Sequence, residues 1–102
     1  MSIAMEILEQ LGGNKFVVNT GSENLRATRK GLTMKLSRNT AKAKWLKIEL
    51  NSLDLYDMVF LSKGKNLSLI IKMEYNNVCA DQLRELFIET TGLYTSLGTM
   101  GR

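Results

Sequence analysis

Two apolar runs at residues 55–62 and 67–75 constrain the fold of this chain more than any other part of its sequence. They are separated by residues 63–66, a glycine-containing gap of the length of a four-residue hairpin loop. In the second run, apolar residues alternate with residues that are mostly polar. The pattern predicts a β-hairpin with one buried face, which would carry Leu67, Leu69, Ile71, Met73 and Tyr75.

Shorter patterns predict the elements on either side of this hairpin. Residues 2–11 have helical spacing and end at two glycines, whereas residues 15–20 are rich in β-branched residues and predict a strand. Alternation predicts further strands at residues 25–28, 32–37 and 45–50. A second helix is predicted to start with a buried Cys79 and to stop at Gly92, before an apolar tail at residues 93–97.

The expected fold is therefore α+β. It is an antiparallel meander of five to six strands, with an N-terminal and a C-terminal helix packed on one face. At 102 residues, of which 44% are hydrophobic, residues 1–102 are expected to form a single domain. No run approaches the roughly 18 apolar residues of a membrane span, and the start carries Glu6 and Glu9 rather than a secretory signal. We expect a cytoplasmic protein without a membrane partner.

The composition removes many kinds of enzyme chemistry. The chain has no histidine and one cysteine, so it lacks the ligands of ordinary zinc sites, the imidazole of nucleophilic catalysis and the pair for a disulfide. Asp54, Asp57 and Glu74 leave a metal-dependent nuclease as an alternative, although exposed acids are common on any protein surface. We expect no enzyme, no cofactor and no metal site.

Charge is segregated along the chain. Residues 26–47 hold eight of the fourteen basic residues and none of the ten acids, so this segment carries +8 and the remainder −4. Such a segment is typical of a surface that meets phosphates or an acidic protein, and the alternative is an ordinary solvated face. Trp45 is expected on the face opposite the core, where it would stack on a base, anchor a protein contact or cover an edge of the core. The candidate partner-binding or nucleic-acid-binding residues are Arg26, Arg29, Lys30, Lys35, Arg38, Lys42, Lys44, Trp45 and Lys47.

Four segments carry a resemblance to a protein family. LGGNKF (residues 11–16), TG (20–21), LDLYDMVF (53–60) and TGLYTSL (91–97) resemble a family of small, mostly uncharacterised proteins encoded by bacteriophages and related mobile elements. The resemblance spans most of the chain and brings no catalytic residues with it. It implies a phage gene that acts in the cytoplasm of an infected bacterium.

Three classes of function remain open. The first is a non-enzymatic protein that occupies a host nucleic-acid-handling complex, as host-defence inhibitors such as anti-CRISPR proteins do. The second is a direct single-stranded nucleic-acid binder, which would show affinity that falls steeply with salt. The third is a homo-oligomeric structural or assembly component.

Overall fold

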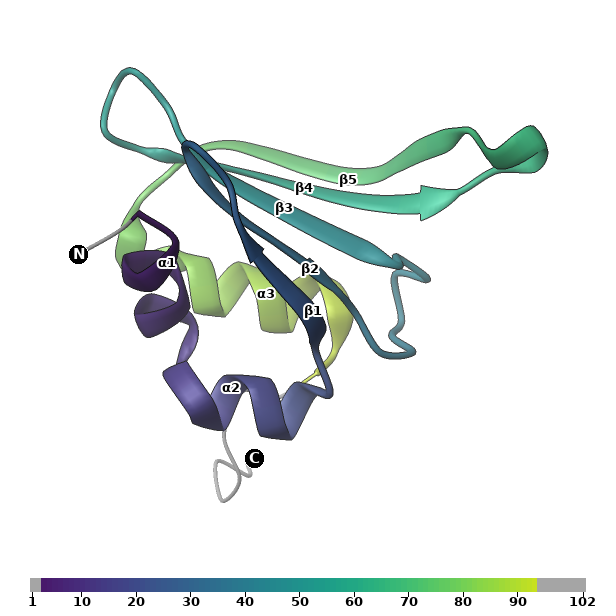
Figure 1. The fold of residues 1–102 in the computed structure, drawn as a ribbon, viewed down its shortest axis with the longest axis horizontal. Coiled ribbons are helices and arrows are strands. Elements are labelled where there is room, and N and C mark those ends of the chain that lie inside the picture. The colour runs from purple at the N-terminus through teal and green to yellow at the C-terminus, as the bar shows by residue number, and fades with distance from the viewer. Residues whose placement is uncertain (1–2, 94–102) are drawn as a thin grey trace.

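An open five-stranded antiparallel sheet, with helices on one face, forms the architecture (Figure 1). The computed structural model describes residues 3–93, except for the side chain of Leu67. The elements, in chain order, are α1 (Ile3–Leu11), α2 (Gly13–Thr20), β1 (Glu23–Ala27), β2 (Gly31–Lys35), β3 (Trp45–Leu50), β4 (Tyr56–Lys63), the 3-10 turn η1 (Lys65–Leu67), β5 (Leu69–Val78), the 3-10 turn η2 (Ala80–Gln82) and α3 (Leu83–Thr91). The strands follow one another across the sheet in sequence order. The expected α+β class and antiparallel meander are confirmed, with five strands.

The expected strand at residues 15–20 is wrong, because these residues belong to helix α2. The helix buries Phe16 and Thr20, which lie one turn apart on the same side. The rings of Phe16 and Phe87 in α3 are in a T-shaped arrangement with 4.9 Å between ring centroids. The Thr20 hydroxyl donates to the Phe16 carbonyl over 2.6 Å. Packing against α3 therefore outweighs the β propensity of this short segment.

The side chains of the central strand β3 alternate between the two faces of the sheet. Leu46 and Ile48 are fully buried and alternate with partly exposed residues. Ile48 lies opposite Leu32 of β2 and Met58 of β4. The backbones of β2 and β3 also approach closely at Gly31, where an added Cβ would lie 1.8 Å from the Ile48 carbonyl oxygen.

The core lies between the sheet and the three helices, which all cover the same face (Figure 1). Aromatic contacts join the two layers, since Phe60 of β4 lies near Phe87, with ring centroids 6.5 Å apart. Burial of apolar side chains is the main favourable contribution to folding, at about 1.5–3 kcal/mol for each large apolar side chain. The buried hydrophobic residues are Ala4, Ile7, Leu11, Phe16, Leu32, Met34, Leu36, Ala43, Leu46, Ile48, Tyr56, Met58, Phe60, Val78, Leu83 and Phe87.

The hairpin formed by β4 and β5 is present. The predicted buried face of its second strand is correct at Tyr75, which packs against the core, and wrong at Leu69, Ile71 and Met73, which are exposed. The side chain of Leu67 lies outside the described residues. The register shifts between Phe60 and Leu61, so that Met73 lies opposite Phe60 whereas Ile71 lies opposite Leu61. Because Phe60 points into the core and Leu61 points away, Met73 and Ile71 face opposite sides of the sheet. The hairpin also extends past the helices (Figure 1), which leaves Met73 exposed, whereas Leu69 and Ile71 are exposed on the opposite, open face.

The start of the last helical segment also differs from the expectation. Val78 is the buried residue at the end of β5, and Cys79 after it is exposed, so its expected burial is wrong. η2 then leads into α3, and Gly92 adopts the left-handed conformation (φ 74°) directly after it, as the expected stop requires. Leu93 packs against the core. The rest of the predicted apolar tail, residues 94–97, lies outside the described residues.

Candidate functional site

The face of the sheet opposite the helices carries the candidate site. Among residues 3–93, no helix packs on this face (Figure 1). Trp45 and Lys47 point toward it from β3, because they alternate with the buried Leu46 and Ile48. Trp45 therefore lies opposite the core, as the alternation predicts.

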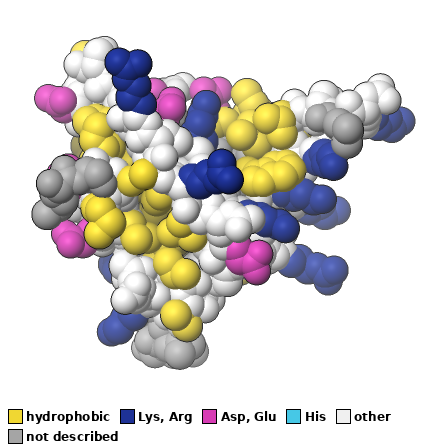
Figure 2. Space-filling model, in the orientation of Figure 1, with side chains coloured by type: hydrophobic (Ala, Val, Ile, Leu, Met, Phe, Trp, Pro, Cys, Tyr) yellow, Lys and Arg dark blue, Asp and Glu magenta, His cyan; other side chains and the backbone are white. Residues whose placement is uncertain are grey.

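Trp45 belongs to a cluster of four apolar side chains on this open face, which we call the apolar patch: Trp45, Leu61, Leu69 and Ile71. Trp45 lies opposite Leu61 in the ladder, and Leu61 lies opposite Ile71. Trp45, Leu61 and Leu69 line one shallow cavity of about 270 Å³ together with Thr33 and Lys47. Figure 2 shows yellow side chains gathered over β4 and β5, next to blue ones. Apolar surface that is contiguous and rimmed by charge is typical of an interaction site.

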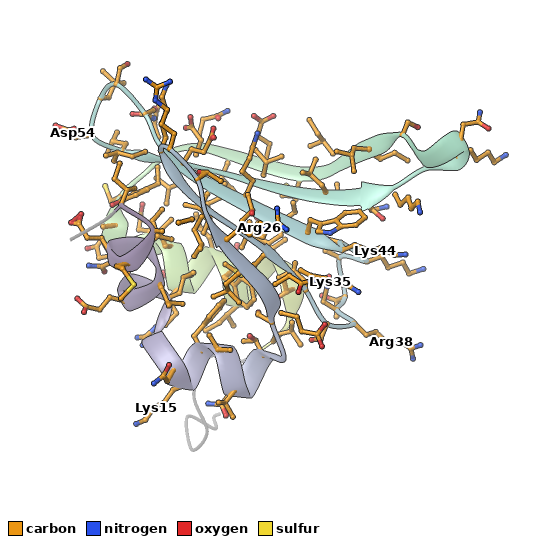
Figure 3. The ribbon with its side chains drawn as sticks, viewed as in Figure 1. Lys15, Arg26, Lys35, Arg38, Lys44 and Asp54 are labelled. Carbon is orange, nitrogen blue, oxygen red and sulfur yellow. The ribbon has the colours of Figure 1, made fainter. Side chains whose placement is uncertain are left out.

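Basic side chains gather at the adjacent end of the sheet, where the loop between β2 and β3 and the turn between β4 and β5 lie. We call this group the basic end. In Figures 2 and 3 it lies to the right, at the opposite end of the sheet from Asp54. A concentration of one sign of charge raises the local potential and attracts acidic partners or phosphates. The basic end consists of Lys35, Arg38, Lys42, Lys44, Lys63 and Lys65.

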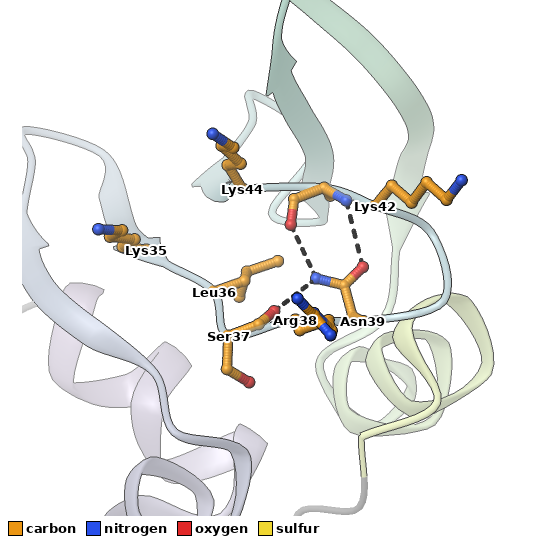
Figure 4. Close-up of a pocket in the computed structure, with 8 residues that line it drawn as sticks. Lys35, Leu36, Ser37, Arg38, Asn39, Lys42 and Lys44 are labelled. Carbon is orange, nitrogen blue, oxygen red and sulfur yellow. Dashed lines mark hydrogen bonds between the residues drawn. The ribbon is translucent and has the colours of Figure 1, made fainter.

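Asn39 holds the loop of the basic end in shape (Figure 4). Its side-chain amide donates to the carbonyls of Ser37 (2.8 Å) and Ala43 (2.7 Å), and its side-chain oxygen accepts from the Ala43 N–H (3.2 Å). Thr40 fixes the same loop to the end of α3, because its N–H donates to the Thr91 carbonyl over 3.0 Å. The loop surrounds a cavity of about 340 Å³ that Lys35, Arg38, Lys42 and Lys44 also line. Because the backbone is held in this way, the charged side chains extend from a defined position.

The structure brings together some of the nine candidate residues from the sequence and separates others. Lys35, Arg38, Lys42 and Lys44 share the loop cavity, whereas Trp45 and Lys47 lie beside it at the apolar patch. Arg26 lies on the open face as well, because its partner Thr33 is in turn opposite Lys47. Arg29 and Lys30 occupy the turn at the other end of the sheet, where the Lys30 carbonyl accepts from the Leu50 N–H over 2.9 Å. They do not contribute to the basic end.

The sequence reasoning missed five residues of this region. The sequence pattern predicts Leu69 and Ile71 on the buried face of the hairpin, and it does not single out Leu61. Only the register shift places Leu69 and Ile71 on the open face. Lys63 and Lys65 were interpreted as parts of a turn. Their signal is visible in the sequence, since two lysines flank a glycine at the tip of an apolar hairpin.

The carboxylates of the nuclease alternative have a structural explanation at Asp57. Its carboxylate accepts hydrogen bonds from the Asn51 side chain and the Asn77 N–H, both over 3.1 Å, and so joins the turn after β3 to the end of β5. Among the described residues, no three carboxylate or cysteine side chains gather closely enough to hold a metal ion. The described helices also include none with the length and apolar character needed to cross a membrane.

The pKa of Tyr56, a residue of the core, is shifted. Burial raises the pKa of Tyr56 above its ordinary value of 10.0, and the negative charge of Glu6 on α1 raises it further. Tyr56 faces the helices rather than the open face, so this shift concerns stability rather than the candidate site.

Comparison with known proteins identifies no family for this chain. No protein-family model matches the chain, and no curated protein or solved structure matches it significantly.

Proposed function

We propose that this chain is a non-enzymatic binding protein that docks the open face of its sheet against a protein of a nucleic-acid-handling complex. The observation that carries the proposal is the apolar patch on the uncovered face, with the basic end along its border. An apolar centre with a polar rim is the usual anatomy of a protein interface. Trp45 supplies the large aromatic side chain that is enriched among residues that dominate binding energy.

The composition of the patch favours a protein over a bare nucleic acid. Leu61, Leu69 and Ile71 have no π-face on which a base could stack, so three of the four patch residues suit apolar protein side chains better. The basic end would then meet acidic side chains of the partner, or phosphates of a nucleic acid that the partner holds.

The resemblance of the chain to small phage-encoded proteins supports a host complex as the partner. On this proposal the protein acts in the host cytoplasm and works by occupation, as a host-defence inhibitor of the anti-CRISPR type does. Occupation needs a complementary surface and no reaction centre, in keeping with a chain without histidine.

A second candidate, direct binding of single-stranded nucleic acid, is favoured by one specific arrangement. Trp45 lies opposite Lys35 and lines the same cavity as Lys47. A nucleotide whose base stacks on the indole would therefore have two cations within reach of its phosphate.

The single tryptophan of the chain allows a direct test of both candidates. Single-stranded DNA and RNA oligomers are titrated into the protein at two salt concentrations while Trp45 emission is recorded. The protein-docking proposal predicts no change in emission with bare nucleic acid. Strong quenching with a steep salt dependence would replace it by the second candidate. A Lys35→Ala variant then distinguishes local contact from nonspecific attraction, with Arg29→Ala at the far end of the sheet as the matched control.

A further inference from the structure

Exposed apolar side chains concentrate on the edge strand β5. Among the described residues, seven large hydrophobic side chains are exposed, and four of them lie on this strand: Leu69 (62%), Ile70 (46%), Ile71 (57%) and Met73 (44%). Leu69 and Ile71 lie on the open face, whereas Met73 is opposite Phe60 on the helix-covered side and Ile70 is opposite Ser62. A partner on one face of the sheet would cover only half of this set. A strand added along the edge would contact side chains on both faces.

The main chain of β5 is suited to such an addition. Within residues 3–93, β5 pairs with β4 and with no other strand. The strand is ten residues long, and the sequence contains no proline that would block pairing. Long apolar edges of this kind tend to pair with another strand.

Charge identifies the partner that fits this edge. A groove of about 490 Å³ runs between the second half of β5 and α3, and its lining includes two acidic residues of α3, Glu85 and Glu89. The tip of the same hairpin, just before β5, carries Lys63 and Lys65. If two β5 strands pair antiparallel, the tip of each hairpin reaches the mouth of the other copy's acidic groove. One chain therefore supplies both halves of a complementary contact, which a two-fold axis uses twice.

We propose that two copies of this chain associate through their β5 edges, antiparallel, into one continuous ten-stranded sheet in which each basic hairpin tip lies against the acidic groove of the other copy. The two-fold axis is perpendicular to the sheet, so both apolar patches stay on the same open face. The dimer touches Leu69 and Ile71 only from the side of the edge and leaves the open face uncovered, so it does not depend on the proposed function.

The first test is the mass of the purified full chain over a range of concentrations, measured by analytical ultracentrifugation. The expected species has twice the 11.5 kDa of one chain. Lys63→Glu with Lys65→Glu is expected to raise the dimer dissociation constant by about tenfold or more, because two pairs of like charges replace attraction. Glu85→Lys with Glu89→Lys should have the same effect, and the fourfold variant should restore the dimer. The control variant, Lys15→Glu with Arg29→Glu, changes the net charge by the same amount as the reversal of Lys63 and Lys65, but away from the edge. It is expected to leave the dissociation constant unchanged.

The second test locates the interface by hydrogen exchange. Amides of β5 are expected to gain protection as concentration rises, while those of β1, the other edge strand, are unchanged. The proposal is overturned by a monomeric mass at about millimolar concentration, by charge reversals that match the control, by a fourfold variant that fails to restore the dimer, or by protection gained at β1 instead of β5. Because mass and exchange are read without any partner, failure here leaves the proposed function to its own test.

Discussion

Trp45 lies directly opposite Leu61, on neighbouring strands β3 and β4 and on the face of the sheet that the helices leave uncovered. Ile71 of β5 continues the same row on the other side of Leu61. Three strands thus build one apolar surface from residues that are far apart in the sequence. Because the residues directly before and after Leu61 in β4 point to the opposite face of the sheet, this arrangement separates side chains that serve binding from side chains that serve the core.

The neighbours Leu61 and Phe60 should therefore respond very differently to truncation. Phe60 is fully buried, so Phe60→Ala is expected to lower the free energy of unfolding by about 3–5 kcal/mol. Leu61 faces outward, and Leu61→Ala should cost no more than about 1 kcal/mol. Urea unfolding of the two variants measures both values. Equal costs would contradict the assignment of the two faces.

The side chain of Asn39 should stabilise the basic end. Asn39→Ala removes three hydrogen bonds and leaves the carbonyls of Ser37 and Ala43 without their side-chain donor. We expect a loss of about 1–3 kcal/mol in unfolding free energy and faster amide exchange across residues 37–44. Arg38→Ala, on the neighbouring exposed residue, is the control and should leave both measurements nearly unchanged.

Gly31 should not tolerate a side chain. A Cβ at this position would lie 1.8 Å from the Ile48 carbonyl oxygen, so Gly31→Ala requires β2 and β3 to separate. A loss of at least about 2 kcal/mol in unfolding free energy is expected. Thr33→Ala, two residues further along the same strand, is the matched control. A Gly31→Ala variant as stable as this control would show that the two strands do not approach so closely.

Alkaline pH should destabilise the protein partly through Tyr56. Its pKa is raised in the folded state, by burial first and by Glu6 second, whereas the unfolded chain ionises at the ordinary value near 10.0. The phenol therefore contributes its full share of stability below pH 10, and this share is lost as the pH rises through the folded pKa. Tyr56→Phe has no phenol to ionise, so its stability should fall less steeply above pH 10 than that of the unchanged chain. Parallel curves of unfolding free energy against pH would contradict the shift.

Regular alternation made much of the fold predictable. Residues 45–50 alternate cleanly, and β3 has those bounds, because a central strand buries one face along its whole length. Helix α2 could not be predicted in this way. Its β-branched residues favour a strand locally, and the contact that decides the outcome joins Phe16 to Phe87, near the other end of the chain.

The candidate site was predictable only in part, for two physical reasons. Charge counted along the chain grouped Arg29 with Arg38, although the turns at either end of β2 lie at opposite ends of the sheet. Alternation also failed in β5, since a one-residue register shift moves Ile71 to the open face and nothing in the sequence marks where the shift falls. Lys35 and Trp45 both belong to the basic segment that the sequence singles out, and they lie opposite each other because β2 and β3 pair directly.

The open face is tested most directly by placing a photo-crosslinking amino acid at Leu69, in cells that naturally express the chain. Leu53 is the matched control position, since it is equally exposed (66% against 62%) but lies in the turn after β3. Docking through the open face predicts a discrete protein adduct from position 69, heavier than a crosslink between two copies of the chain, and no such adduct from position 53. The same adduct from both positions, or none from position 69, would contradict it.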